Sequence, residues 1–349
     1  MSKKITHTKL NLSFTESLLK WGRVNGRKNL PWSPEKGSHY HPYKVWLSEI
    51  ILQQTQLKTG KNFYKKIIST FPSVEELAKA KLEKVLSAWS GLGYYNRAKN
   101  LHLSAVKICS ENKVVFPKDA KEWMQLPGVG FSTAASISAF VNKEKVPVMD
   151  ANVIRVFARQ FKLKEFVNSV ALKKKILPIA YKCLPIMPID MPVYTQSIMD
   201  LGSIICRPHH PKCDLCPVSA MCLAYLSKQE SNYPVRKTKK IREVKKINWL
   251  VPYTKDSVAL VCLEDTKLWQ GLWTPIQFCN SSQIPNEAFF ITKFRSPISN
   301  FTLEVSIWGF LCNEQKLYKF AKWFKWKELL NSPVPSTVTK ALRSFRLYL

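Results

Sequence analysis

The chain has 349 residues, and 46 % of them are hydrophobic, which is enough to bury the cores of two domains. It carries 54 Lys and Arg against 24 Asp and Glu, a formal net charge of +30, which indicates a polyanionic partner, most plausibly nucleic acid, with a generally basic proteome as the alternative. The first residues hold no apolar run of signal-peptide type and no stretch reaches membrane-spanning length, so we expect a cytoplasmic, nucleoid-associated protein without a membrane partner.

Residues 1–226 predict a mainly α-helical domain. Capping signals precede apolar residues at helical spacing in three places, Ser13 with Glu16, Ser73 with Glu76, and Asp119 with Glu122. Strand-like alternation is scarce in this part of the chain.

A carboxylate lies within an apolar helix predicted over residues 43–58. Trp46, Leu47 and Ile50 are sequence neighbours of Glu49. If this face of the helix is buried, desolvation raises the pKa of the carboxyl and keeps it protonated near neutrality, as a general acid requires. If the face is exposed, Glu49 is an ordinary solvated residue, and periodicity alone favours this second interpretation.

Residues 91–102, GLGYYNRAKNLH, interleave glycines, tyrosines and basic residues. Aromatic rings beside cations suit stacking on bases or intercalation into DNA. A tight turn packed by tyrosines is the structural alternative.

A Gly-x-Gly turn at residues 126–130, LPGVG, opens onto a helix predicted to begin near Ser132. Glycines permit close backbone approach, and a helix N-terminus presents N–H groups to an anion. The five residues are the helix–hairpin–helix signature for binding a DNA backbone without reading its sequence. An ordinary interhelical turn is the alternative. The expected DNA contacts are Leu126, Gly128, Val129 and Gly130.

Asp150 stands twenty residues after Gly130, just before another predicted helix. An Asp in this position can serve simply as an N-cap. Because the preceding hairpin would lie on a phosphate backbone, the same carboxylate could also face a sugar.

Four cysteines crowd into residues 206–222, CRPHHPKCDLCPVSAMC, with gaps of six, two and five residues. In a reducing compartment such clusters are metal ligands more often than disulfides. Four thiolates suit either zinc or an iron–sulfur cluster, but zinc sites usually pair two Cys-x2-Cys knuckles and only one is present. The expected ligands are Cys206, Cys213, Cys216 and Cys222. Arg207 and Lys212 in the same loop are expected to contact phosphates.

Two further segments follow the helical domain. Residues 227–246 contain eight Lys or Arg among twenty and predict a solvated basic linker, which could also touch phosphates. Residues 247–349 contain strand-like stretches such as SVALVCLE and FTLEVSIWGFL, and the helical patterns WKELL and VTKALRSF. We therefore expect a smaller α+β domain at the C-terminal end.

In this order, the motifs resemble those of the endonuclease III superfamily of DNA glycosylases, and within it the branch that excises adenine. The shared segments are LPW, YKVWLSEIILQQTQ, GLGYYNRAKNLH, LPGVG with STA, MDANVIRV, MDLG and the cysteine loop. The resemblance covers residues 12–226 and, weakly, the remainder. It implies a helix–hairpin–helix glycosylase fold with a [4Fe–4S] cluster on the four cysteines. It also implies a monomeric base-excision-repair hydrolase whose partner is double-stranded DNA with adenine opposite 8-oxoguanine or guanine.

The resemblance also implies roles for individual residues. Glu49 would protonate the adenine, and Asp150, oriented by Asn152, would stabilise the cationic sugar. Tyr94 and Gln54 would lie beside the 8-oxoguanine that faces the adenine.

The branch has two alternatives. Endonuclease III excises oxidised pyrimidines and cuts the strand with a lysine nucleophile, where this chain has Ser132. A non-catalytic DNA-binding protein on the same scaffold would not need both carboxylates.

The C-terminal segment resembles the Nudix-like domain that recognises 8-oxoguanine in this branch, although it lacks the Glu-rich box of Nudix hydrolases. The usual Phe-Ser-His of the recognition loop is replaced by Ile298, Ser299 and Asn300. Ser299 is therefore the expected lesion contact, and the departure puts the strength of the preference for 8-oxoguanine in doubt.

Overall fold

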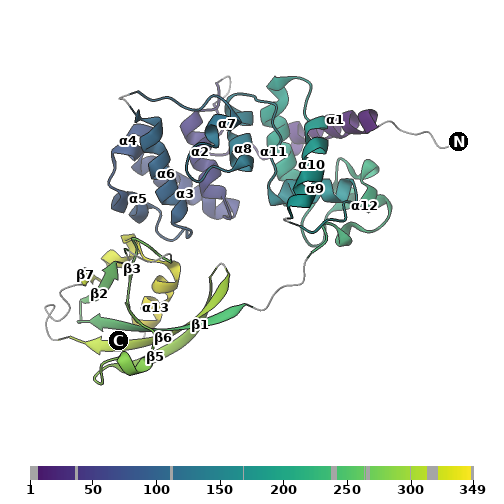
Figure 1. Cartoon of the computed structure of the whole chain (residues 1–349). Helices are drawn as coiled ribbons and strands as arrows, with labels where there is room; N and C mark the ends of the chain where they lie inside the picture. The colour runs from purple at the N-terminus through teal and green to yellow at the C-terminus, as the bar shows by residue number, and fades with distance from the viewer. Residues whose placement is uncertain are drawn as a thin grey trace. The chain divides into compact units, whose positions relative to one another are not determined.

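The computed structural model describes residues 7–35, 38–110, 113–167, 169–236, 242–262, 264, 268–298, 300–312 and 321–346. The chain divides into two compact units, a helical one and one built around a sheet (Figure 1). The first takes in Met1–Ala78 and Leu103–Thr238, and the second takes in Lys79–His102 and Lys239–Leu349.

The predicted helical domain is confirmed. In chain order the helices are α1 (His7–Asn25), α2 (Pro42–Leu52), α3 (Leu57–Thr70), α4 (Val74–Lys79), α5 (Leu82–Ala88), α6 (Asn96–Ile108), α7 (Ala120–Trp123), α8 (Phe131–Val141), α9 (Ala151–Gln160), α10 (Val170–Lys182), α11 (Met191–Asp200) and α12 (Leu223–Leu226). Within the described ranges, no helix combines the length and the apolar character needed to cross a membrane.

Two of the three predicted helix starts are confirmed. Ser73 accepts a backbone N–H at 3.3 Å ahead of α4, and Asp119 accepts one at 2.7 Å ahead of α7. The third was wrong, because α1 already begins at His7 and Ser13 lies in its interior. A capping pattern marks the start of a helix only where no helix precedes it. At Ser13 the helix already extends upstream to His7.

Helices α2 and α8 pack against each other and position the first candidate site. On α2, Trp46 is fully buried and its ring centroid lies 6.2 Å from that of Trp123 on α7. Ala134 and Ala135 on α8 are also fully buried, and such small side chains let two helices approach closely.

The predicted α+β domain is also confirmed. Its strands are β1 (Glu243–Tyr253), β2 (Ser257–Cys262), β3 (Trp273–Thr274), β4 (Ile276–Phe278), β5 (Phe289–Ile298), β6 (Phe301–Leu311) and β7 (Lys322–Lys325). Among the described residues they form one seven-stranded sheet in the order β3-β2-β1-β6-β5, with β4 on β1 and β7 on β2. β1 and β6 run parallel, and β5 and β6 form an antiparallel hairpin.

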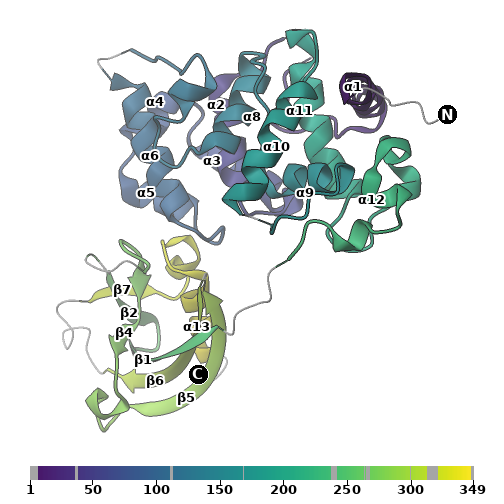
Figure 2. The same cartoon turned by 45° about the vertical axis from the view of Figure 1, so that its right-hand side comes forward.

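Helix α13 (Ser336–Arg346) covers one face of this sheet and contacts β5 and β6, which curve around it (Figure 2). Val338 and Phe345 of α13 are fully buried against Val305 and Ile307 of β6, in the same core. The predicted helix at WKELL is a single 3-10 turn, Glu328–Asn331.

Residues 79–102 belong to the second unit through specific contacts. The Tyr95 hydroxyl donates to the carbonyl oxygen of Val334 at 2.7 Å and is buried. Glu83 and Lys322 form an exposed ion pair at 3.7 Å.

Part of the segment predicted to be a solvated linker is packed. Tyr233 is buried, and its carbonyl oxygen accepts from Arg159 Nε on α9 at 3.0 Å. Val235 forms a bridge with Phe166. The linker was predicted from its basic composition. Composition gives no information on which backbone carbonyls accept hydrogen bonds, so it could not predict these contacts.

Candidate active site and cysteine loop

Glu49 is half-buried on α2, between the fully buried Ser48 and Ile50. Burial raises the pKa of its carboxyl to about 7. The buried hydroxyl of Ser136 on α8 acts to lower this pKa, and the charge of Asp150 acts to raise it. The carboxyl therefore titrates near neutral pH, and the alternative of a solvated glutamate was wrong.

Asp150 is the N-cap of α9, as predicted. Its Oδ1 accepts the backbone N–H of Val153 at 2.7 Å, and its Oδ2 accepts from Nδ2 of Asn152 at 3.2 Å. Two donors therefore fix the orientation of the carboxylate on a rigid helix end. Asp150 is half-buried, so its carboxylate remains partly accessible to a ligand.

Arg155 supports this arrangement from the next turn of α9. Its Nη2 donates to Oδ1 of Asn152 at 2.9 Å and to the carbonyl oxygen of Gly202 at 2.6 Å. Its Nε donates to the carbonyl oxygen of Cys206 at 2.8 Å. A Cβ at Gly202 would lie 2.7 Å from Cβ of Asn152, so only glycine permits this close approach.

The predicted hairpin forms, and it presents backbone rather than side chains. Leu126 and Val129 are buried, whereas Gly128 and Gly130 are exposed. Gly128 has φ +78°, a conformation that favours glycine. Gly130 is the N-cap of α8, and a Cβ built on it would meet no atom within 4 Å. The space in front of this helix N-terminus suits an approaching phosphate.

Gln53 holds the hairpin, a role that the sequence did not reveal. Its Nε2 donates to Oγ1 of Thr133 at 3.1 Å and to the carbonyl oxygen of Gly128 at 3.3 Å. The neighbouring Gln54 is exposed and has φ +56°. The sequence alone does not distinguish the two adjacent glutamines. Because α2 ends at Leu52, the Gln53 side chain contacts the hairpin whereas Gln54 is exposed.

Ser132 lies in the first turn of α8, which begins at Phe131, one residue before the predicted start. Its Oγ accepts the backbone N–H of Met149 at 3.2 Å. The hydroxyl therefore ties the start of α8 to the segment that leads into Asp150.

Tyr94 lies in the second unit, before α6. Its side chain is 53 % exposed and its φ is +49°. Non-glycine residues rarely adopt this conformation, and those that do cluster at functional sites. The other predicted contact of this unit, Ser299, lies outside the described residues.

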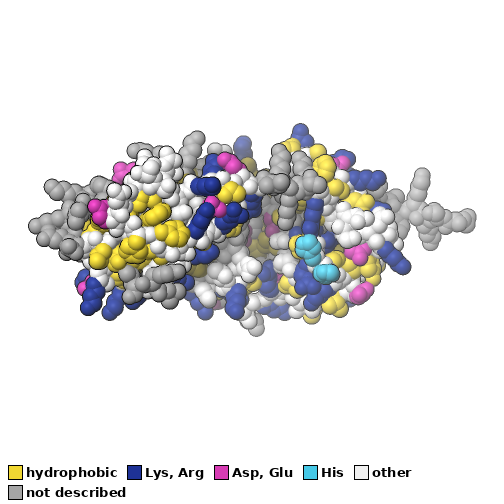
Figure 3. Space-filling view, turned by 90° about the horizontal axis from the view of Figure 1, so that it is seen from below, with side chains coloured by type: hydrophobic (Ala, Val, Ile, Leu, Met, Phe, Trp, Pro, Cys, Tyr) yellow, Lys and Arg dark blue, Asp and Glu magenta, His cyan; other side chains and the backbone are white. Residues whose placement is uncertain are grey.

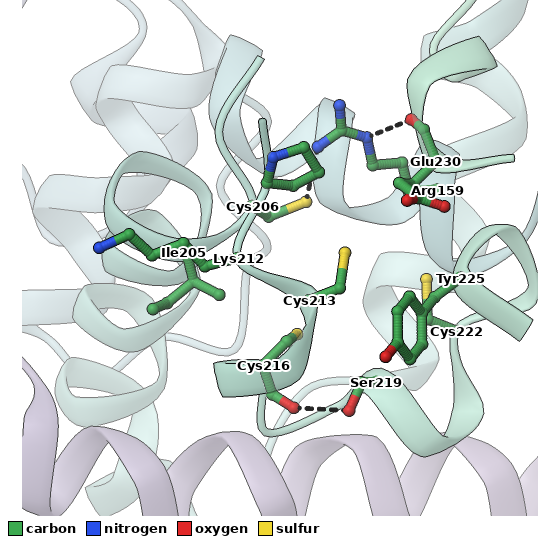
Figure 4. Close-up of a pocket in the computed structure, with 11 residues that line it drawn as sticks. Arg159, Ile205, Cys206, Lys212, Cys213, Cys216, Ser219, Cys222, Tyr225 and Glu230 are labelled. Carbon is green, nitrogen blue, oxygen red and sulfur yellow. Dashed lines mark hydrogen bonds between the residues drawn. The ribbon is translucent and has the colours of Figure 1, made fainter. Parts of the chain in front are cut away.

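The four cysteines of the loop surround one pocket in the first unit, with their sulfur atoms directed toward a shared space (Figure 4). Burial raises the pKa of the Cys216 thiol to about 12 and that of Cys213 to about 11. Among the described residues, no three His, Cys, Asp or Glu side chains are placed to hold a single metal ion. Four cysteine sulfurs around one space are a donor set that suits either a zinc ion or an iron–sulfur cluster.

Arg159 on α9 forms one wall of this pocket. It is 2 % exposed, and its Nη1 donates to the sulfur of Cys206 at 3.2 Å and to the carbonyl oxygen of Arg207 at 2.8 Å (Figure 4). Its Nε donates to the carbonyl oxygen of Glu230 at 2.9 Å. Such a guanidinium orders the loop by binding its carbonyls.

Arg207 and Lys212 are exposed on the same loop, and Arg207 donates to the carbonyl oxygen of His210 at 3.2 Å. On the face in Figure 3, Lys and Arg side chains are widely spread and outnumber Asp and Glu. A surface of this kind attracts a phosphate backbone.

Comparison with known proteins agrees with this geometry. The family model for HhH-GPD superfamily base excision DNA repair proteins matches residues 47–177. An adenine DNA glycosylase of Buchnera aphidicola subsp. Schizaphis graminum is 33 % identical to the chain over 348 residues, which is 95 % of this chain and 99 % of the relative. The chain belongs to the adenine DNA glycosylase family. A human adenine DNA glycosylase is 35 % identical over 61 % of this chain and 39 % of its own length.

Solved structures show the same fold. A thermostable thymine-DNA glycosylase matches with a TM-score of 0.53 and 24 % identity, over 63 % of this chain and 98 % of its own. A non-covalent endonuclease III–DNA complex matches with a TM-score of 0.52 and 18 % identity, over 64 % of this chain and 98 % of its own. As a member of the adenine DNA glycosylase family, the protein is a base-excision-repair enzyme, and the alternative of a non-catalytic DNA-binding protein is not supported.

Proposed function

We propose that this protein releases adenine mispaired with 8-oxoguanine or guanine from double-stranded DNA and leaves the strand intact. The observation that carries the proposal is the pair of carboxyl groups in different surroundings. Glu49 has a pKa raised to about 7 by burial, whereas Asp150 caps α9 and accepts hydrogen bonds from the backbone N–H of Val153 and from Nδ2 of Asn152. Two carboxyl groups in such different surroundings can divide the roles of acid and charge stabiliser.

Glu49 acts as the general acid. It gives its proton to N7 of adenine, so the base departs as a neutral molecule with the electron pair of the broken N-glycosidic bond. The carboxylate of Asp150 stabilises the positive charge that remains on the sugar. A water then adds its oxygen to the sugar carbon and releases a proton, which completes the hydrolysis.

The hairpin and the base-stacking residues prepare the substrate. The exposed backbone of Gly128 and Gly130 binds a phosphate group, which positions the duplex without reading its sequence. The adenine leaves the helical stack, and Tyr94 and Gln54 occupy the space beside the base that faced it. The left-handed backbone and the exposure of both residues support this role.

Ser132 accounts for the absence of strand cleavage. A glycosylase that also cuts the strand forms a Schiff base between a lysine and the sugar. Ser132 lacks an amine, and its Oγ already accepts a hydrogen bond from the backbone of Met149.

The cysteine loop holds one [4Fe–4S] cluster on Cys206, Cys213, Cys216 and Cys222. The four cysteine sulfurs that line one pocket support this assignment, and the single Cys-x2-Cys knuckle favours it over zinc, whose sites usually pair two such knuckles. When bound, the cluster supplies rigidity to a short loop that has little apolar core of its own. The loop in turn presents Arg207 and Lys212 to DNA.

The C-terminal domain, residues 247–349, acts as a Nudix-like reader of the lesion, with Ser299 as the proposed contact. The helical domain over residues 1–226 supplies the chemistry, and residues 227–246 join the two. The confirmed α+β architecture of the C-terminal part supports this division of labour.

A panel of duplexes tests the proposal. Purified protein is incubated with A:8-oxoguanine, A:G, A:T and thymine glycol duplexes, and released bases and strand breaks are measured separately. Release of adenine from the first two, with breaks only after alkali, is expected. Glu49→Gln and Asp150→Asn should lose release while still binding the duplex, and Glu16→Gln, an exposed glutamate on α1, serves as the matched control.

Two outcomes would reject the proposal. Release of thymine glycol, or efficient borohydride trapping of a protein–DNA Schiff base, would assign the chain the endonuclease III reaction. Full activity of Glu49→Gln would remove Glu49 from the acid's role.

A further inference from the structure

The turn before α6 holds Tyr94 in a left-handed backbone conformation that non-glycine residues rarely adopt. Gly91 and Gly93 have φ of +92° and +75°, and Tyr94 itself has φ +49°. A tyrosine with positive φ is strained, and it keeps this conformation only where its neighbours hold it in place. The neighbours that do so determine how the exposed ring is presented.

Arg97 contacts this turn at several points from the first turn of α6. Its Nη2 donates to the carbonyl oxygen of Gly93 at 3.1 Å and to that of Leu92 at 3.3 Å. Trp89 Nε1 donates to the same Gly93 oxygen at 3.1 Å. The carbonyl immediately before Tyr94 is therefore held by two donors.

The guanidinium of Arg97 also contacts two aromatic rings. Its central carbon is 5.3 Å from the ring centroid of Trp89 and 5.7 Å from that of Tyr94. Trp89 is fully buried and Arg97 is 9 % exposed, so both belong to the fixed part of the molecule, whereas Tyr94 is 53 % exposed. Burial lowers the pKa of Arg97 to about 10, which leaves it charged at neutral pH.

We propose that Arg97 is a positioning residue that holds the Tyr94 ring in the orientation in which it enters DNA. The cation attracts the face of the Tyr94 ring that it covers, and the remainder of the half-exposed ring stays available to a base. Fixing the ring before binding avoids part of the entropy that ordering it on DNA would cost. The inference rests on the proposed function, in which Tyr94 stacks in the duplex.

A purely structural role for Arg97, as a brace of α6, predicts a different pattern. A brace would affect stability and binding whether or not Tyr94 is present. A positioning residue acts through the ring, so its removal matters only while the ring is there. A double-mutant cycle separates the two roles.

The cycle uses Arg97→Gln, Tyr94→Ala and the double variant, with equilibrium binding to an A:8-oxoguanine duplex as the readout. Arg97→Gln is expected to weaken binding about 10-fold in the parent and less than about 2-fold in Tyr94→Ala. Lys107→Gln removes an exposed charge from the same helix and should weaken binding equally in both backgrounds. The same loss from Arg97→Gln in both backgrounds would overturn the proposal.

Two further measurements keep the test decisive. Should Arg97→Gln fail to fold by circular dichroism, Arg97→Lys replaces it, because lysine keeps the charge but loses the planar, forked guanidinium. Adenine release by the parent is measured in the same buffer, and its absence would reject the proposed function independently of the cycle. Unchanged binding by Tyr94→Ala would reject the role of Tyr94, and with it the role proposed for Arg97.

Discussion

Arg155 donates to the carbonyl oxygen of Cys206 at 2.8 Å, and so links the cysteine loop to the helix that Asp150 caps. The same guanidinium binds Asn152, whose amide binds the Asp150 carboxylate. Three consecutive hydrogen bonds, through the side chains of Arg155 and Asn152, therefore connect a proposed metal ligand with a proposed catalytic carboxylate. A change in the conformation of the cysteine loop would therefore alter the orientation of the Asp150 carboxylate through these hydrogen bonds.

Replacement of Arg155 by Gln should slow adenine release about 10- to 100-fold, the usual effect of losing a supporting partner outside the reacting groups. Single-turnover release with enzyme in excess measures this effect apart from binding. Arg207 is an exposed arginine of the cysteine loop. Arg207→Gln should weaken DNA binding and leave the rate of adenine release by saturated enzyme unchanged. Equal saturated rates for Arg155→Gln and the parent would contradict the link.

The pH dependence of adenine release follows from Glu49. Its pKa is raised to about 7, so the carboxyl holds its proton below this pH and loses it above. Single-turnover release should be nearly constant below pH 6 and should fall about 10-fold per unit well above pH 7. Because Ser136 acts to lower this pKa, Ser136→Ala should move the fall to higher pH.

A pH–rate profile of the parent and of Ser136→Ala checks both statements. Thr133→Ala, on the same helix, is the control because its hydroxyl contacts Gln53 and not Glu49. A fall centred near pH 4.5 in the parent would mean that Glu49 is not desolvated when DNA is bound.

The sequence located most of the reacting groups but few of the residues that hold them. Capping spacing identified Asp150 as an N-cap, and LPGVG identified the hairpin, because both patterns are local. Arg155 and Arg159 were missed, since their partners are backbone carbonyls about 50 or more residues away and any sequence supplies carbonyls. Burial of Glu49 could not be decided either, because periodicity shows which face is apolar but not what packs against it.

The proposed iron–sulfur cluster can be tested directly by metal analysis. Protein purified without oxygen should contain iron and acid-labile sulfide in about equal amounts and no zinc. Cys213→Ser should lose most of the iron, whereas Cys279→Ser, at an exposed cysteine of the second unit, should keep it. One zinc per chain and no sulfide would show that the loop closes around a single ion.

Loss of the metal should also destabilise the loop without unfolding the sheet. Buried thiols with a raised pKa are neutral at pH 7, so the empty loop lacks the ionic bonds that order it. Hydrogen exchange should increase over residues 206–226 after removal of the metal and stay unchanged over β1 and β6. Uniform exchange changes across both units would contradict this local effect.

Arg27, which is 28 % exposed, forms an ion pair with the buried Asp200 at the end of α11, and its removal gives a prediction for stability. Asp200 has no exposed side-chain area, and Arg27 Nε donates to its Oδ1 at 2.6 Å. Arg27→Ala leaves a buried carboxylate without its cation and should lower the free energy of unfolding by about 3–5 kcal/mol. The Arg27 backbone N–H and the Gln196 amide still donate to Asp200, which places the expected loss toward the lower end of that range.

A matched pair on the surface provides the control for this prediction. Arg23 contacts Asp190 at 2.6 Å, but the two side chains are 56 % and 25 % exposed, so water already solvates both charges. Arg23→Ala should therefore cost less than about 1 kcal/mol. Urea unfolding of both variants at pH 7 measures the difference, and raising the salt concentration should reduce only the smaller effect, because buried pairs are screened much less. Equal losses for the two variants would mean that Asp200 is not held in the interior by Arg27.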